Sequence, residues 1–330
     1  MSLVVTMADR GYLARAEVLI DSILETDPRQ EIGFLGLGDV QHSDVAFRVS
    51  EAHFMTFEDL LEKSPSLAKA CQTRNKAERY FTSLPSFLRQ LMSQVPQGEW
   101  LVYLDADIYL YQPLVDLLPE AKDMSAVIVP HRHYRWNRMR LAKFGEFNVG
   151  LVAFRNDLEG RKLLDYWADS CIQWCRDKPV AGLYADQKYL EHFEEISDAV
   201  VVDRRIGANL APWNSSLLRI SSSGSTLFAD DQLVLYFHMQ GLRRTSKHWY
   251  LGHIPYFSLA GRALRELVYR PYLSKLERKS RENGTLSGSS RESLNAGTKF
   301  LSKLTLGIAA LLRQRISIRS LEGGERLDSD

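Results

Sequence analysis

Two carboxylates, Asp105 and Asp107, stand directly after the apolar run Trp100–Leu104. Such a run predicts a buried strand of a parallel sheet, and open α/β sheets bind ligands at the carboxyl ends of these strands. Two carboxylates at the end of a buried strand are costly unless something compensates their charge. A hard divalent cation, Mn²⁺ or Mg²⁺, does so and keeps coordination positions for phosphate oxygens. The pair therefore predicts a metal site, with two solvated aspartates in a loop as the alternative.

Three further segments carry side chains that could serve the same site. His238 follows an apolar run, 233–237, that predicts a strand, and a histidine there is either a ligand or a hydrogen-bonded structural residue. Asp186 opens a short predicted helix, where it could also be the N-cap. Residues 132–143 hold six basic side chains, His133 included, interleaved with Tyr134 and Trp136. For that segment we predict a mobile loop over a site that binds a polar ligand.

The elements that must position these residues alternate between strand and helix. Residues 3–7 are apolar, as in a strand, and residues 12–25 repeat apolar side chains at helical spacing. Free backbone N–H groups at such a helix start suit a nucleotide. The chain has no G-x-G-x-x-G and no P-loop sequence, which argues against Rossmann dinucleotide binding and Walker-type NTP binding. The same patterns predict strands at 32–37, 124–129, 146–154 and 199–202, and helices at 157–174 and at 85–95, with Pro85 in its first turn.

The charge of the chain is small overall but unevenly distributed. A hydrophobic content of 45% and a charged content of 25% are those of an ordinary globular protein, and the net charge of +1 gives no reason to expect a nucleic-acid partner. Residues 1–256 carry 28 Lys and Arg against 33 Asp and Glu, whereas residues 257–330 carry 14 against 8. The chain is therefore a mildly acidic body with a basic tail.

The cysteines and the chain start bear on the compartment. Cys71, Cys171 and Cys175 suit a reducing environment and form no disulfide framework, so we expect packing thiols. The first predicted strand starts close to residue 2 without a basic n-region, and no run of 18 apolar residues occurs, so we expect neither a secretory signal nor a membrane span. We predict a cytoplasmic protein that could contact the inner face of a membrane.

The tail divides into three predicted parts. Residues 257–282 predict a basic helical extension, 283–298 are rich in Ser, Gly and Asn as in a flexible linker, and 299–330 predict an amphipathic basic helix and its end. Such a helix can lie on an anionic bilayer. Packing on the body of the protein or in a dimer is the alternative, and residues 1–256 are predicted to form the main domain.

Four motifs, taken together and in order, resemble the GT-A nucleotide-sugar glycosyltransferases. The resemblance is to the branch containing glycogenin and the bacterial lipopolysaccharide galactosyltransferases, and it is closest to uncharacterised bacterial enzymes of surface-polysaccharide loci. It spans about residues 2–256 and implies a GT-A fold, a mixed and mostly parallel sheet flanked by helices. The motifs are Tyr-Leu-Asp-Ala-Asp-Ile-Tyr109, Phe-Asn-Val-Gly-Leu-Val-Ala-Phe-Arg-Asn-Asp157, Ala-Asp-Gln-Lys-Tyr-Leu190 and Gly-Ala-Asn-Leu-Ala-Pro-Trp-Asn214.

The resemblance implies a role for individual residues. Asp105 and Asp107 match the metal-binding pair and His238 the third ligand, from a His-x-x-Gly motif ending at Gly241. Two carboxylates and an imidazole suit Mn²⁺, with Mg²⁺ as the other option. The remaining matches are Asn148, facing the donor sugar or acceptor; Asp186 and Gln187, beside the anomeric carbon; and Thr6, Asp9 and Tyr12, around the uridine.

The basic residues depart from the family pattern. A lysine usually follows the histidine by six residues and contacts the diphosphate; here that position is Arg244, and Lys247 is a second candidate. Arginine keeps the charge but changes the geometry. The basic residue that the family often places before the Asp-x-Asp strand is not clearly matched, since Arg79 and Arg89 both lie nearby.

The resemblance implies a metal-dependent hexosyltransferase-type enzyme. It would move a sugar from a nucleotide-diphosphate donor, a UDP-sugar, to a glycan or lipid-linked saccharide, with retention of configuration, as in surface polysaccharide or lipopolysaccharide biosynthesis. Two alternatives stay open. One is a catalytically inactive protein that binds nucleotide sugars or carbohydrate, and the other is a phosphatase whose first Asp would be a phosphorylated nucleophile. Tyr109 stands where such a phosphatase has threonine.

Overall fold

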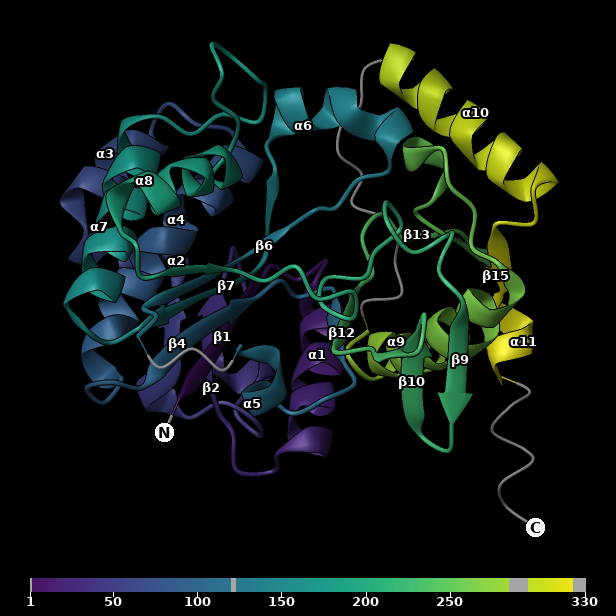
Figure 1. The fold of residues 1–330 in the computed structure, drawn as a ribbon, viewed down its shortest axis with the longest axis horizontal. Coiled ribbons are helices and arrows are strands. Elements are labelled where there is room, and N and C mark those ends of the chain that lie inside the picture. Colours follow the sequence, from purple (N-terminus) through teal and green to yellow (C-terminus); the bar gives the residue numbers. More distant parts are fainter. Residues whose placement is uncertain (1, 120–122, 285–295, 323–330) are drawn as a thin grey trace.

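The computed structural model describes residues 2–119, 123–284 and 296–322, and a seven-stranded sheet runs through its centre (Figure 1). The strand order is β3-β2-β1-β4-β7-β6-β8. The two pairs made by β7 are antiparallel and the other four are parallel, which confirms the mixed, mostly parallel sheet predicted from the sequence. The strands are β1 (Leu3–Ala8), β2 (Glu31–Gly36), β3 (Phe54–Thr56), β4 (Trp100–Leu104), β6 (Ala126–Pro130), β7 (Phe147–Arg155) and β8 (Val200–Val202).

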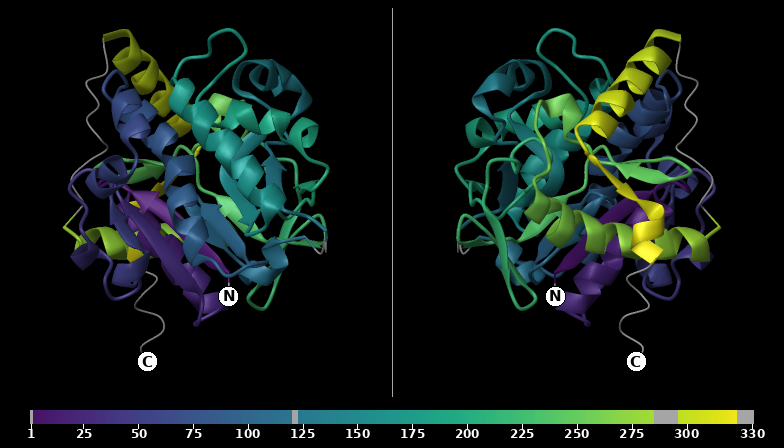
Figure 2. Two further views of the ribbon diagram at one scale, coloured as in Figure 1. Left: turned by 90° about the vertical axis from the view of Figure 1, so that its left-hand side faces the viewer. Right: turned by 90° about the vertical axis from the view of Figure 1, so that its right-hand side faces the viewer.

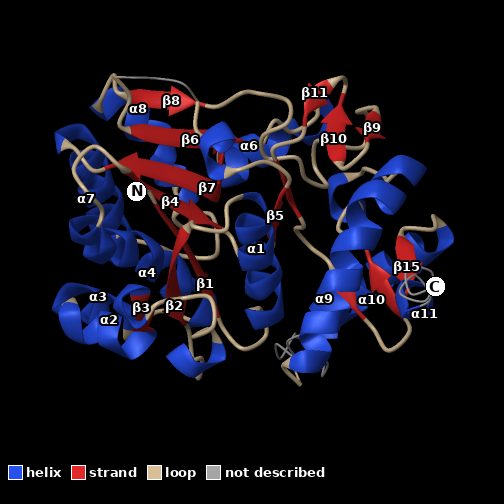
Figure 3. Ribbon diagram, turned by 90° about the horizontal axis from the view of Figure 1, so that it is seen from below, coloured by secondary structure: helices blue, strands red, loops and turns tan. Residues whose placement is uncertain are grey.

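Helices cover both faces of this sheet, because its strands are apolar on both sides. Figure 3 shows α1 (Leu13–Thr26) on one side, and α4 (Lys76–Leu91) and α7 (Leu158–Gln173) on the other. Successive residues of β1 divide between two apolar clusters: Val5 packs with the α4–α7 side and Val4 with the α1 side. The shorter helices are α2 (Phe57–Lys63), α3 (Pro65–Cys71), α5 (Leu114–Leu117), α6 (Arg138–Phe144) and α8 (Phe193–Ile196).

Helix α4 starts nine residues earlier than the sequence analysis predicts, at Lys76 instead of Pro85. A capping box at Asn75 and Glu78 begins it: the Asn75 side chain accepts from the Glu78 N–H at 3.0 Å, and the Glu78 carboxylate accepts from the Asn75 N–H at 3.1 Å. Pro85 therefore lies inside the helix, where it costs about 3 kcal/mol relative to an ordinary residue. Burial of the apolar face around Phe87 and Leu88 offsets that cost.

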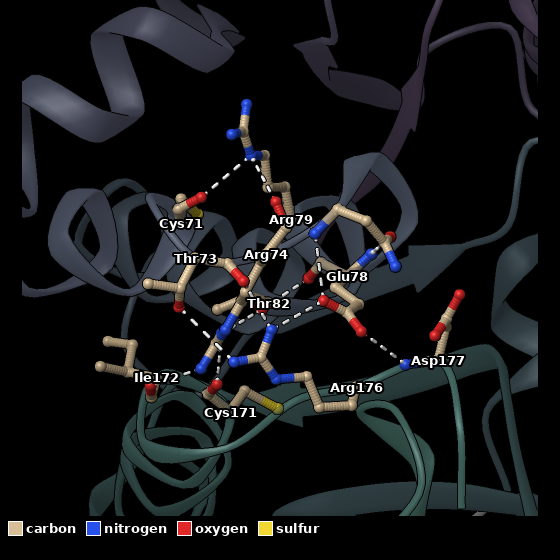
Figure 4. Close-up of polar contacts among 11 residues, drawn as sticks. Cys71, Thr73, Arg74, Glu78, Arg79, Thr82, Cys171, Ile172, Arg176 and Asp177 are labelled. Atoms are coloured by element: carbon tan, nitrogen blue, oxygen red, sulfur yellow. Dashed lines mark hydrogen bonds and ion pairs between the residues drawn. The ribbon is translucent and has the colours of Figure 1, made fainter.

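A buried arginine ties the start of α4 to the end of α7 (Figure 4). Arg74 donates to the carbonyl oxygens of Cys171 at 2.7 Å and Ile172 at 2.6 Å, two groups that the last turn of α7 leaves without intrahelical partners. Arg176, just beyond α7, donates in turn to the Glu78 carboxylate at 2.9 Å. The two helices that cover one face of the sheet are thus fixed to each other by charge-assisted hydrogen bonds. Cys71, Cys171 and Cys175 are buried and free, as predicted.

The chain after the central sheet forms a third apolar cluster against the outer side of α1. Its main element is the helix formed by the π-helical segment η7 (Leu264–Tyr269) and α9 (Arg270–Glu282), which lies within residues 257–282, the predicted basic helical extension. Tyr272, Leu273 and Leu276 of α9 are buried with Val18 of α1. The other elements here are β5 (Ile108–Leu110), β9 (Ile220–Ser223), β10 (Thr226–Ala229), β11 (Gln232–Leu233), β12 (Tyr236–His238), β13 (Arg243–Arg244), β14 (His248–Tyr250), α10 (Ala296–Leu311), β15 (Arg315–Ser317) and α11 (Ile318–Glu322).

The segment 299–330, predicted as an amphipathic basic helix and its end, contains more than one element in its described part. Helix α10 stops at Leu311, and β15 then pairs with β14 in an antiparallel ladder, with Ile316 and Ile318 buried (Figure 2, right). The reason is visible in the sequence: Ile316 and Ile318 alternate with polar residues, which is the strand period. No helix in the described ranges is long and apolar enough to cross a bilayer. Most of the predicted linker, residues 285–295, lies outside the described residues, and the predicted domain division stays a prediction.

Candidate functional site

Strand β12 brings His238 to the two aspartates from about 130 positions further along the chain. The chain turns at Asp105, where the Ile108 N–H donates to the Asp105 carbonyl at 3.0 Å, and continues as β5. Strand β5 pairs with β12, so that His238 lies opposite Ile108. The Met239 N–H also donates to the Asp107 carbonyl at 2.8 Å. The sheet pairing therefore sets the imidazole beside the carboxylates at the end of β4.

The three side chains form a compact group of metal-ligand type. Their ligand atoms all lie within 4.8 Å of one another. His238 Nε2 is 3.1 Å from Asp107 Oδ1 and 3.7 Å from Asp105 Oδ2. The side chains of His238 and Asp107 are 2% and 8% exposed, whereas that of Asp105 is 32% exposed, so the group opens to solvent on the Asp105 side. The convergence predicted for these residues is observed, and their role as ligands stays a prediction.

The hydrogen bonds of His238 leave its Nε2 available to a cation. Asn148 Oδ1 accepts from the Gly150 N–H at 3.1 Å and lies 3.2 Å from His238 Nδ1, so Nδ1 carries the proton and donates. Nε2 is buried and, although Asp107 Oδ1 lies 3.1 Å away, it makes no aligned hydrogen bond with a residue in the described ranges. In a neutral ring its lone pair would face two carboxylates, which is unfavourable unless a positive charge lies among them. A histidine oriented through its other nitrogen is the usual form of a metal ligand, so the residues present fit a divalent cation.

Gly150 makes room for this imidazole. A Cβ at residue 150 would lie 2.5 Å from Asn148 Oδ1 and 2.7 Å from His238 Nδ1. Strand β7 is antiparallel to β4, with Leu151 opposite Leu104, so the start of β7 lies at the carboxyl end of β4. This explains the Asn-Val-Gly spacing: the asparagine orients the histidine and the glycine leaves the space it fills.

The charged groups at the site shift one another's pKa. Burial alone would lower the pKa of His238, but the negative charges of Asp107 and Asp105 outweigh it and raise the pKa. Burial opposes ionisation of Asp107 as well, yet His238 keeps its pKa below the usual value. Burial raises the pKa of Asp105, and the charge of Asp107 adds to the effect although His238 opposes it. One proton or one cation among the three groups is what the site favours.

Asp186 also lies close to this group. Burial, together with the charge of Asp105, raises its pKa to about 8. Its backbone carbonyl accepts from the buried indole of Trp167 at 2.9 Å, and Ala185 before it has a left-handed φ of 46°. Its side chain makes no capping bond to the short helix η5 (Gln187–His192) that follows. A non-glycine residue in the left-handed region is strained, and such strain is commonest at functional sites.

The residues predicted around a nucleoside lie at the end of β1 and the start of α1. Asp9 Oδ1 accepts from the N–H groups of Gly11 at 3.0 Å and Tyr12 at 3.2 Å, and Lys76 lies 2.7 Å from Asp9 Oδ2. The Tyr12 residue is 45% exposed, and its pKa is raised by burial of the hydroxyl and by the charge of Asp107. Thr6 Oγ1 is buried and has no hydrogen-bond partner in the part of the chain that the structure describes. Beyond burial, the charges of Asp107 and Asp105 raise the pKa of Tyr12, and the nucleoside-binding role of all three residues stays a prediction.

Arg15 is a residue that the sequence analysis did not single out. Its guanidinium lies 4.5 Å from the centre of the Tyr12 ring and 6.0 Å from that of Trp249, and its charge helps to lower the pKa of Asp107. Tyr12 and Arg15 are three apart at the start of a helix, so they share a face. One arginine on an amphipathic helix is common, and only its spacing from Tyr12 could have pointed to it.

Arg244 and Lys247, the two predicted diphosphate contacts, differ from each other in their surroundings. Arg244 is engaged with Glu277 through two hydrogen bonds, 2.7 Å from Nε and 3.0 Å from an Nη, on the C-terminal side. Lys247 follows it in the turn between β13 and β14, and its carbonyl accepts from the Ile318 N–H at 3.1 Å. Gln187 is turned toward α6 and donates to the Phe144 carbonyl. Asn148 is engaged with His238, so its amide oxygen serves the imidazole.

Aromatic rings connect the site to helix α6. The ring centroid of buried Trp213 lies 5.4 Å from that of His238 and 5.5 Å from that of Tyr256. The Arg140 guanidinium lies in turn 4.7 Å from the centre of the Tyr256 ring. Residues 132–143, predicted as a loop, contain instead the turn η4 (Arg135–Asn137) and the start of α6. The loop prediction was wrong because the bonds of Asn137 and Arg140 to the 255–256 backbone hold a short helix in place.

Comparison with known proteins adds relatives and similar folds. No protein-family model matches the chain. The chain is 27% identical to the uncharacterized protein YfnD of Bacillus subtilis (strain 168) over 228 residues, which is 68% of this chain and 73% of that protein. It is 24% identical to the uncharacterized protein YfnF of the same organism over 249 residues, 73% of this chain and 82% of that protein.

Among solved structures, the chain is similar to galactosyltransferase LgtC in complex with donor and acceptor sugar analogs, at 15% identity and a TM-score of 0.49 over 88% of this chain and 98% of that chain. It is similar to mouse xyloside xylosyltransferase 1, at 14% identity and a TM-score of 0.45 over 73% of this chain and 98% of that chain. These solved structures are glycosyltransferases, the class whose motifs the sequence resembles.

Proposed function

We propose that this protein is a metal-dependent glycosyltransferase that moves a sugar from a UDP-sugar to a saccharide or lipid-linked saccharide acceptor with retention of configuration. The observation that carries the proposal is the convergence of Asp105, Asp107 and His238 at the end of β4, with the buried Nε2 of His238 only 3.1 Å from Asp107 Oδ1 and without an aligned hydrogen bond to a described residue. The four sequence motifs support it independently of this geometry.

The donor would lie across the start of α1. Thr6, Asp9 and Tyr12 would hold the uridine, with the exposed ring of Tyr12 available to stack on the base. Asp105, Asp107 and His238 would hold Mn²⁺ or Mg²⁺, which when bound neutralises charge on a diphosphate leaving group. Because Arg244 is engaged with Glu277, we assign the diphosphate to Arg15 and Lys247 as well as to the ion.

The residues of the chain would then position the sugar for transfer. Asp186 and Gln187 would lie on the sugar, where the Asp186 carboxyl can hydrogen-bond a hydroxyl group. Asn148 would act by orienting His238 through Nδ1. The acceptor proton would pass to the leaving phosphate, as in front-face substitution, so we assign no residue as a separate general base. The protein would act in the cytoplasm.

The test is release of UDP from a set of UDP-sugars, with and without Mn²⁺. We expect UDP release to require the metal and to be abolished in Asp107→Asn. We also expect the product to retain the anomeric configuration of the donor sugar. Tight binding of UDP-sugars with no turnover would support the inactive binding protein instead. Release of phosphate from phosphate monoesters without turnover of UDP-sugars would overturn the proposal.

A further inference from the structure

Helix α6 carries basic side chains that form no ion pair with any residue that the structure describes. Elsewhere in the described ranges, basic side chains commonly pair with carboxylates, as Lys279 does with Asp21 at 3.0 Å and Lys275 with Glu25 at 2.6 Å. The basic side chains of η4 and α6 form no such ion pair with a described residue. They are Arg135, Arg138, Arg140 and Lys143.

Two of these cations line a hollow. An open hollow of about 560 Å³ is bounded by Met139, Arg140, Lys143 and Phe144, so that it is apolar on some sides and positive on others. Met139 is 85% exposed, so its apolar surface is accessible to a ligand in the hollow. A ligand that combines carbon surface with negative charge would match both features.

The hollow adjoins the proposed reaction site. Arg140 lies over the Tyr256 ring, and the pKa of Tyr256, raised mainly by burial, is lowered by the charge of Arg140 and raised by that of Asp107. Phe144 contacts Tyr184 with ring centroids 4.8 Å apart, and its carbonyl accepts from Gln187. The pKa of Tyr184, raised mainly by burial, is raised further by the charge of Asp186. Arg140 is thus linked to His238 through the rings of Tyr256 and Trp213, and Phe144 is linked to Gln187 through its carbonyl.

We propose that the acceptor is anionic, a saccharide that carries a phosphate, diphosphate or carboxylate group, and that Arg140 and Lys143 hold this group in the hollow. That the bound anion is the acceptor rests on the proposed function. That the hollow binds an anion does not. Arg140 is held by its hydrogen bond to the backbone at 255–256, so its guanidinium would bind the anion in a fixed orientation. The exposed Lys143 supplies a second positive charge. The negative group can belong to a glycan or to the diphosphate of a lipid-linked saccharide.

The experiment measures equilibrium binding by calorimetry with UDP and Mn²⁺ at saturation, so that the proposed diphosphate site is filled. The probes are glucose, glucose 6-phosphate, inorganic diphosphate and geranyl diphosphate. Glucose 6-phosphate or geranyl diphosphate should bind at least tenfold more tightly than glucose. Preference for glucose 6-phosphate indicates an anionic glycan, and preference for geranyl diphosphate over inorganic diphosphate indicates a lipid-linked source.

The variants assign the binding to the hollow. Lys143→Gln should weaken the binding of the preferred anion about tenfold, Lys143→Arg should restore most of it, and Arg138→Gln, on the same helix but outside the hollow, should leave it unchanged. Equal binding of glucose and the anions, or an equal loss in Lys143→Gln and Arg138→Gln, would overturn the proposal. UDP binding is measured separately: if UDP fails to bind, the proposed function fails, and the anion titrations without UDP still decide for or against the site.

Discussion

The C-terminal side of the molecule and the carboxyl end of the central sheet use charged residues in opposite ways. Around α9, charges are paired and partly buried. The Glu277 carboxylate accepts hydrogen bonds from Arg244 and from the indole N–H of Trp249, and Lys279 forms an ion pair with Asp21. At the end of β4, two carboxylates and an imidazole crowd together with His238 Nε2 unsatisfied. Crowded, uncompensated charges lower stability, and the C-terminal side avoids them by pairing its charges. Their presence at the end of β4 therefore indicates a functional site. Substitutions in the two regions should therefore separate stability from activity.

The largest effect on stability is expected for Leu273→Ala in α9. Leu273 is fully buried in the C-terminal cluster, and truncation of such a leucine costs about 2–5 kcal/mol of the free energy of unfolding. Leu304→Ala on α10, where the side chain is 51% exposed, should change it by about 0.5 kcal/mol or less. Urea denaturation measures both, and equal small losses would show that the C-terminal segment is not part of the core.

Glu277→Gln should cost about 2–3 kcal/mol of unfolding free energy. Removing one partner of a buried ion pair costs about 3–5 kcal/mol, and the 21% exposure of the Arg244 side chain reduces the loss. The activity of the folded fraction should not change. Lys143→Gln, which removes a cation without an ion-pair partner among the described residues, is the matched control and should leave stability unaltered. A large loss of activity per folded molecule in Glu277→Gln would mean that Arg244 serves the site directly.

Gly150→Ala should weaken the binding of Mn²⁺ about 10–100-fold, the range seen when the groups that orient a metal ligand are disturbed. The added Cβ would come within 2.7 Å of His238 Nδ1 and displace the imidazole. Gly261→Ala, whose Cβ would meet nothing within 4 Å, is the control. Calorimetric titration of Mn²⁺ gives the affinity, and unchanged binding in Gly150→Ala would mean that His238 is not a ligand.

The smallest effect concerns pH and a histidine away from the site. His253 is fully buried between Ser258 and Tyr269, and burial lowers its pKa to about 3. Below about pH 6.5, His253 binds a proton in the unfolded chain but stays neutral in the folded protein. The contribution of the neutral, buried His253 to stability is therefore present above that pH and is lost as pH falls toward 3. Between about pH 7 and 5.5 the loss is about 1 kcal/mol. Relative to His253→Gln, the native protein should lose that much more stability over this interval in urea denaturation, and parallel pH profiles would contradict the account.

The sheet could be predicted well from the sequence and the connections poorly. Apolar runs such as Trp100–Leu104 indicated the strands because a strand covered on both faces needs continuous apolar residues. The start of α4 was missed because the Asn75–Glu78 capping box is a local signal that was outweighed by Pro85. The paired strand β15 was missed because its alternation of apolar and polar residues is only a few residues long and directly follows a helical pattern.

For the site, the chemistry of Asp105 and Asp107 follows from their place after a strand, whereas the role of His238 as a third ligand came from a motif resemblance. Nothing in the local sequence says that β12 pairs with β5, which is a long-range contact. Arg15 was missed, and the engagement of Arg244 with Glu277 was not foreseen, because both depend on how the C-terminal helix packs against α1.

The most direct test of the account is Mn²⁺ binding in the presence of UDP, followed by the electron paramagnetic resonance signal of the free ion. The native protein should bind one ion per chain, and Asp107→Asn and His238→Gln should each lower the affinity at least tenfold while their metal-free thermal unfolding stays close to that of the native protein. One bound ion in all three proteins, or none in the native protein, would contradict the assignment of Asp105, Asp107 and His238 as a metal site.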